Sequence, residues 1–144
     1  MLGETYDFKL SPDKLYYLFR SQGPKGEIIK VVLFQRIRQK RFNLAFGDMK
    51  DGQMDDNIVS DNHDFVKVIA TVAACVYDFV KNNPGIALEI VPVDERRKML
   101  YNAVFKRHHV FIQQQFSILG GIDDIPEPYS AEKIYDLFEL YHII

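Results

Sequence analysis

One stretch of the chain combines cations with an aromatic side chain at the spacing of a β-strand. If residues 27–37 are extended, alternate side chains share a face, and Lys30, Phe34 and Arg36 lie on the same side. Cations pair with phosphates and exposed rings stack on bases, so the pattern is typical of a surface that binds single-stranded nucleic acid. The predicted nucleic-acid-binding residues are Lys30, Phe34, Arg36, Arg38, Lys40 and Arg41. Alternatively, these residues form the solvent face of a half-buried sheet, where Lys and Arg discourage edge pairing.

A second combination could cleave RNA without a metal. Arg97, Tyr101 and His108 are spaced by four and seven residues, so one helical face could present all three. Acid–base cleavage needs a proton-transferring His or Tyr and a cation for the phosphate. The structural alternative places His108 in an apolar stripe and Arg97 in a contact with a carboxylate such as Asp94. The sequence does not decide between these interpretations, and we assign no catalytic residue.

Acidic residues gather between Asp48 and Asp64, and such oxygen-rich segments suit Mg²⁺ or Ca²⁺. The spacing does not fit an EF-hand, because Lys50 occupies a ligand position and no Glu closes the loop. A solvated loop leading into a helix explains the same residues. The single cysteine, Cys75, lies in an apolar segment and is expected to be a buried small side chain. We therefore assign no metal site and no cofactor.

Periodicity predicts the elements that position these residues. Alternation predicts strands over 15–20, 27–37 and 42–46, with an earlier strand around Tyr6, Phe8 and Leu10. Apolar spacing predicts a helix from about Asp61 or Asn62 to 82, and Asp94 can cap a second helix of about 22 residues. Further strands are expected over 86–91 and 116–119, and 47–60 is expected to be a loop. In the tail, Tyr135, Phe138 and Tyr141 favour a short amphipathic helix.

These elements predict an α+β fold. We expect an antiparallel sheet of four to five strands with two helices on one face, in the order β-β-β-β-α-β-α. Residues 1–121 would form a single domain, and residues 122–144 an acidic C-terminal appendage containing the short helix.

Composition agrees with one globular domain. The chain has 144 residues, of which 47% are hydrophobic and 26% charged. No apolar run reaches the roughly 18 residues of a membrane span and the N-terminus lacks a signal-peptide core, so we expect a cytoplasmic protein without a membrane partner. The net charge of −2 is unevenly distributed: residues 1–47 carry nine Lys/Arg against four Asp/Glu, and residues 116–144 carry one against six. The basic segments could attract an anionic partner or pair with the acidic ones.

Four motifs resemble an uncharacterised bacterial family of unknown function. The pattern Ser-x-Gly-Pro-x-Gly is met at residues 21–26, and Asn-Leu-x-Phe-Gly-Asp at 43–48. A segment containing Lys-Val-x-Ala-Thr-Val begins at Asp64, where His63 replaces an expected Gly, and Arg-x-x-Leu-Tyr spans 97–101. The resemblance covers about residues 6–119 and implies no activity.

The function that we predict is a non-enzymatic binding domain for an anionic partner, with single-stranded nucleic acid as the leading candidate. One alternative is a protein-interaction or self-assembly module, such as a homodimer, that acts through residues 122–144. The other is a small metal-independent ribonuclease.

Overall fold

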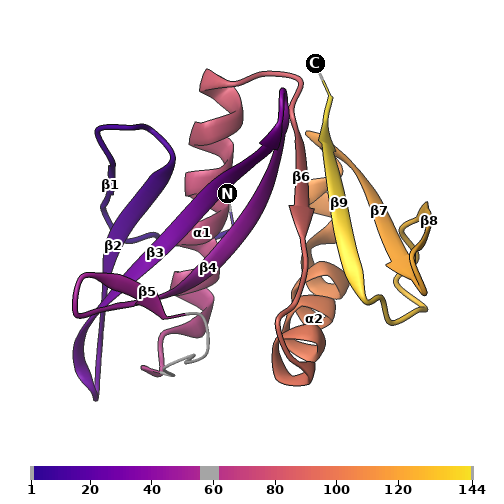
Figure 1. Cartoon of the computed structure of the whole chain (residues 1–144). Helices are drawn as coiled ribbons and strands as arrows, with labels where there is room; N and C mark the ends of the chain where they lie inside the picture. Colours follow the sequence, from indigo (N-terminus) through magenta and orange to yellow (C-terminus); the bar gives the residue numbers. More distant parts are fainter. Residues whose placement is uncertain (1, 56–61, 144) are drawn as a thin grey trace. The chain divides into compact units, whose positions relative to one another are not determined.

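The structure is a computed structural model that describes residues 2–55 and 62–143 (Figure 1). It contains nine strands and two helices in these residues. The first six elements are β1 (Phe8–Leu10), β2 (Tyr16–Gly23), β3 (Gly26–Arg38), β4 (Arg41–Lys50), β5 (Gln53–Asp55) and α1 (Phe65–Asn82). The remaining five are β6 (Ala87–Ile90), α2 (Glu95–Ile112), β7 (Phe116–Ile122), β8 (Ile125–Pro128) and β9 (Leu137–His142).

The nine strands form one mostly antiparallel sheet in the order β1-β2-β3-β4-β6-β9-β7-β8, with β5 paired to β4. Among the described strands, β4 and β6 pair in parallel. The chain is therefore α+β with two helices. Our expectation of a four- to five-stranded sheet with a C-terminal helical appendage is wrong.

The tail explains most of this error. Apolar residues at positions 134, 137, 138 and 141 match the spacing of a helix, but Phe138 and Leu140 also alternate as in a strand. In a segment this short both periods fit, and tertiary pairing decides. Residues 137–142 form β9, which pairs with β6 on one side and β7 on the other.

The expected loop over 47–60 is also partly wrong. Strand β4 continues to Lys50, and β5 pairs back on it. Asp51 and Gly52 connect the two strands with φ angles of 51° and 77°. An Asp-Gly pair is a strong hairpin signal because both positions of such a turn need positive φ. Residues 56–61 lie outside the described part of the chain.

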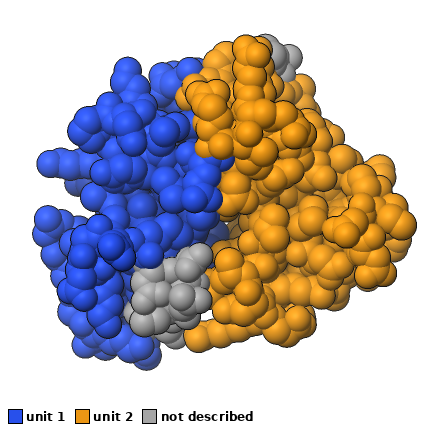
Figure 2. Space-filling view, in the orientation of Figure 1, with its two compact units in different colours: residues 1–35, 45–82 blue, residues 36–44, 83–144 orange. Residues whose placement is uncertain are grey.

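The chain forms two compact units (Figure 2). Unit 1 consists of residues 1–35 and 45–82, and unit 2 of residues 36–44 and 83–144. Strands β3 and β4 each contribute residues to both units. The division into residues 1–121 and 122–144 that we expected from the sequence does not follow these units, since β8 and β9 belong to unit 2.

Helix α1 covers one face of the strands in unit 1. Its predicted apolar stripe is present, with Val68, Phe79 and Val80 among its buried residues. The ring of Phe79 stacks on that of Phe34 in β3, with 3.8 Å between centroids. The Tyr17 hydroxyl donates to Asp78 Oδ2 at 2.6 Å, which ties the polar side of α1 to β2.

Helix α2 belongs to unit 2 and begins where the sequence predicts. Asp94 is its N-cap, and its side chain accepts a hydrogen bond from the backbone N–H of Arg97. Phe105 of α2 stacks on Phe138 of β9 at 4.1 Å. Gly120 of β7 leaves room for Tyr135, because a Cβ at this position would lie 2.3 Å from the Tyr135 ring. No helix in the described residues is long and apolar enough to cross a membrane.

Candidate functional site

The structure separates the six predicted nucleic-acid-binding residues into two groups. Lys30 and Phe34 are buried, with 2% and 0% of their surface exposed, so the expectation that they face solvent is wrong. Both faces of β3 carry apolar residues, and alternation alone does not tell which face a helix covers. Helix α1 packs on the face that carries Phe34, because Phe79 stacks there.

Lys30 forms an ion pair instead of a binding surface. Its Nζ donates to Asp48 Oδ1 at 2.5 Å, and the two side chains are 2% and 9% exposed. Asp48 ends one of the motifs that we quoted, and in the structure this carboxylate neutralises a buried cation. The pair holds β3 and β4 together inside unit 1.

The other cations remain near the surface. Arg36, Arg38 and Lys40 are exposed, and we call these three residues the basic turn. β3 ends at Arg38 and β4 begins at Arg41, so two residues connect the strands, and Lys40 has a φ of 61°. Within the described residues no member of the basic turn forms an ion pair, while the Arg36 guanidinium lies 4.8 Å from the centre of the Phe42 ring.

Arg41, the sixth predicted residue, is held by carboxylates of unit 2. Its Nη2 atom lies 2.6 Å from Glu89 Oε1 and 2.9 Å from Glu139 Oε2. Its Nη1 donates to the Tyr141 hydroxyl at 3.1 Å. Burial alone would lower the pKa of Arg41, but hydrogen bonds with Tyr141, Glu139 and Glu89 together raise it above its usual value. Arg41 is therefore a fixed cation whose charge is already balanced.

The residues that could have formed a ribonuclease do not present a cation to a phosphate. Arg97 is only 3% exposed, and its Nη1 donates to Asp94 Oδ2 at 2.7 Å, which confirms the predicted structural contact. Its Nε and Nη2 atoms have no hydrogen-bond partner in the described structure. His108 is half-buried, and its pKa is lowered first by burial and then by Arg107.

The acidic segment is only partly described. Asp48 pairs with Lys30, and Asp64 Oδ2 accepts hydrogen bonds from the hydroxyls of Tyr6 and Ser21, each at 2.5 Å. Asp56 and Asp61 lie outside the described residues, and so does the side chain of Asp55. In the part of the chain that is described, no group of three or more His, Cys, Asp or Glu side chains could hold a metal ion.

Two of the quoted motifs meet at the start of α1. Asn62, which is 1% exposed, donates to Gly26 O at 2.9 Å and accepts from Lys25 N at 2.8 Å. Gly23 has no room for a side chain, since a Cβ would lie 2.0 Å from the Asn62 carbonyl oxygen. The hairpin of β2 and β3 therefore contacts the segment that leads into α1 through hydrogen bonds and close packing. The motif at residues 21–26 thus has a structural role.

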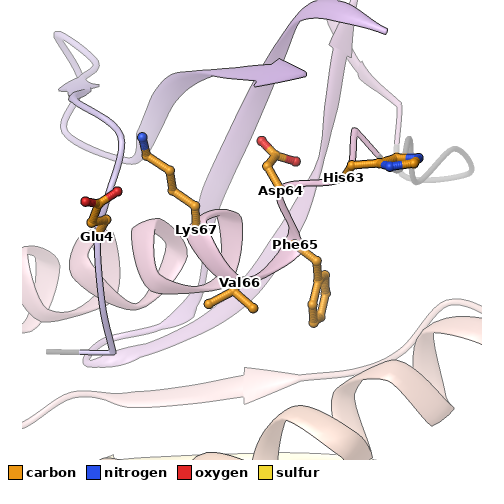
Figure 3. A pocket seen from close by; sticks show the side chains of 6 residues that line it. All are labelled: Glu4, His63, Asp64, Phe65, Val66 and Lys67. Atoms are coloured by element: carbon orange, nitrogen blue, oxygen red, sulfur yellow. The ribbon is translucent and has the colours of Figure 1, made fainter. Parts of the chain in front are cut away.

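A shallow pocket opens beside this junction (Figure 3). Lys67 and Asp64 point to one side of the helix start, whereas Phe65 and Val66 point to the other. The Lys67 ammonium lies 4.3 Å from the centre of the Tyr6 ring. Because the lining groups diverge and Asp64 is already hydrogen-bonded, the pocket does not assemble a nucleophile with a base. Its lining residues are Glu4, His63, Asp64, Phe65, Val66 and Lys67.

Sequence reasoning missed one aromatic residue near the basic turn. Tyr141 lies on β9 and is 37% exposed, and the Arg41 guanidinium is 5.7 Å from its ring centre. We expected Tyr141 on a helix, where nothing connects it with Arg41. The sequence signal that could have placed Tyr141 on a strand is the alternation of the apolar Phe138 and Leu140 with Glu139 and Tyr141.

Comparison with known proteins places the chain in a family of unknown function. No curated protein and no solved structure matches the chain. The model of a family of unknown function, DUF6934, matches residues 3–142, which is nearly the whole sequence. The chain therefore belongs to the DUF6934 family of unknown function.

Proposed function

We propose that the protein is a binding domain whose basic turn takes up a short single strand of nucleic acid. The observation that carries this proposal is the exposure of Arg36, Arg38 and Lys40 without ion pairs in the described structure. Charge that is not neutralised within the protein attracts phosphates and releases their counterions on binding. The sequence between residues 28 and 47 contains no Asp or Glu, so this attraction is not offset locally along the chain.

The charge of the whole chain favours a short strand over a long duplex. The net charge is −2, so the molecule as a whole does not attract a polyanion. Three cations can meet only a few phosphates, which suits a local contact with a flexible strand. Arg41 contributes less to this attraction, because Glu89 and Glu139 balance its charge.

The direct test is binding of a fluorescently labelled oligothymidine of about 12 nucleotides, a typical single-strand site size, measured by anisotropy at low salt. The triple variant Arg36→Gln/Arg38→Gln/Lys40→Gln should weaken binding about a hundredfold or more, because three phosphate contacts are lost. The matched control Arg96→Gln/Lys106→Gln/Arg107→Gln removes the same charge from exposed positions of α2. Equal losses in the two triple variants, or no binding by the parent protein, would contradict the proposal.

A second proposal concerns self-association through residues 122–144. Ile125 and Ile134 are 69% and 51% exposed, which favours an apolar contact with a second copy. Edge-to-edge pairing is disfavoured, because β8 contains Pro126 and Pro128, which lack a backbone N–H. Light scattering tests this: the parent protein should have the mass of a dimer and the variant Ile125→Ser/Ile134→Ser that of a monomer. A monomeric parent protein would refute the second proposal.

A further inference from the structure

A row of residues in register crosses four strands of unit 2. Arg41 of β4 is opposite Ala87 of β6, Ala87 is opposite Tyr141 of β9, and Tyr141 is opposite Ser117 of β7. Residues that are directly opposite each other point to the same face of a sheet. The neighbouring row, which contains Phe42, Leu88, Leu140 and Ile118, is buried and points to the other face.

Helix α2 covers that other face. Phe105 of α2 stacks on Phe138, which shares the buried face with Leu140 two residues further along β9. Tyr141 has the opposite orientation and keeps 37% of its surface exposed. On both neighbouring strands its partners are small, Ala87 and Ser117, so they do not extend far over its ring.

The ring of Tyr141 is held in place by its polar neighbours. Its hydroxyl donates to Glu139 Oε2 at 2.6 Å and accepts from Arg41 Nη1 at 3.1 Å. Arg41 is in turn fixed by Glu89, which accepts from its Nε at 2.9 Å and from its Nη2 at 2.6 Å. A ring that is already ordered loses little conformational entropy when a ligand packs on it.

We propose that Tyr141 is a stacking platform for one unpaired base of the strand that binds the basic turn, an inference that rests on the proposed function of that turn. Arg41 connects the two features, because it follows Lys40 directly and contacts the Tyr141 ring. β4 and β9 are separated by two strand spacings, about 10 Å, so a base on Tyr141 and a phosphate at the turn belong to nearby nucleotides. Stacking requires an unpaired base, and the ligand class is therefore a single strand.

The test compares two ligands of equal charge: an oligothymidine and an abasic phosphodiester chain of the same length. The parent protein should bind the oligothymidine about 5- to 150-fold more tightly, the range expected for one stacked base. Tyr141→Ala and Tyr141→Leu should both abolish this preference while the affinity for the abasic chain persists. Tyr141→Leu keeps apolar volume on β9, which guards against loss of the fold. The control Phe65→Leu removes a different exposed aromatic ring, at the start of α1, and should keep the preference.

The outcomes separate the two proposals. If the parent protein binds neither ligand, the proposed function of the basic turn fails and the stacking inference fails with it. If it binds both ligands equally, or if the Tyr141 variants keep the preference for bases, only the stacking inference is overturned.

Discussion

At the residue scale, whether a cation is structural or available to a ligand depends on the side chains that surround it. Lys30 and Arg36 are both cations of strand β3. In the described part of the chain, Lys30 has a carboxylate at ion-pair distance, whereas Arg36 has none. Removing two charges from water costs several kcal/mol per ion. The electrostatic attraction between two well-placed partners offsets a similar amount of free energy. Lys30 is therefore a structural residue, whereas Arg36 remains available to a ligand.

Lys30→Met should destabilise the protein by about 3–5 kcal/mol, because Asp48 is left as an unpaired buried charge. The double variant Lys30→Met/Asp48→Leu should recover much of this loss. Urea unfolding measures both. Arg20→Met is the control: its pair with Glu27 is exposed, at 67% and 42%, and its loss should cost at most about 1 kcal/mol. A double variant as unstable as Lys30→Met would contradict the account.

Cys75 gives a prediction for alkaline pH. Burial, and then the Asp78 carboxylate, raises the pKa of this thiol from 9.0 to about 12. The folded state keeps the proton that the unfolded state loses, so the stabilisation is complete below pH 9 and declines as pH rises from 9 to about 12. Between pH 8 and 10 the parent protein should lose about 1.4 kcal/mol more stability than Cys75→Ala. Parallel pH profiles in urea unfolding would show that the thiol is not shifted.

At the element scale, hydrogen bonds to the hairpin of β2 and β3 hold the start of α1. Asp64 accepts from Tyr6 and Ser21, and Asn62 bonds across the hairpin. Asp61 and Asp64 have the three-residue spacing of a capping box in the sequence. Asp61 lies outside the described residues, and Asp64 binds side chains from elsewhere in unit 1.

Asn62→Ala should cost about 1–3 kcal/mol, because the part-buried hydrogen bonds from Lys25 and to Gly26 are lost and each contributes about 0.5–1.5 kcal/mol. Thermal unfolding of this variant is compared with Asn82→Ala, in which an exposed amide donates to the Asp78 carbonyl within α1. The control should change stability by about 0.5 kcal/mol or less. Similar losses in the two variants would mean that the hairpin contact does not fix the helix start.

Elements with one clear period could be predicted from the sequence. The alternation around β3, the apolar stripe of α1 and the cap at Asp94 appear where the residues indicate. The tail could not be placed, because a short apolar segment fits two periods and its partner β6 is distant in the sequence. The hairpin at Asp51–Gly52 did have a local turn signal, which the assignment of a loop over 47–60 passed over.

At the scale of the whole molecule, contacts between residues that are distant in the sequence limited the prediction of the site. The basic turn could be read from adjacent residues, but burial of Phe34 depends on which face α1 covers. Tyr141 approaches Arg41 only because β6 and β9 pair in this register, 100 residues away in sequence. No local pattern around residue 141 indicates that pairing.

The position of β9 predicts how the chain responds to truncation. β9 pairs with both β6 and β7, so ending the chain at Ile125 removes an internal strand and leaves the hydrogen-bonding groups of both neighbours unpaired. The truncated protein should lose cooperative thermal unfolding in circular dichroism. An unchanged melting transition would show that residues 126–144 are dispensable for the fold.

The central claim is that the cations of the basic turn bind phosphates, and the salt dependence of oligothymidine binding tests it most directly. For a single strand, a plot of the logarithm of the association constant against the logarithm of the salt concentration has a slope that changes by about 0.7 for each phosphate contact. Arg36→Gln/Arg38→Gln/Lys40→Gln should therefore have a slope shallower by about 2 than the parent protein, while Arg96→Gln/Lys106→Gln/Arg107→Gln keeps the parent slope. An identical slope in all three proteins would contradict the account.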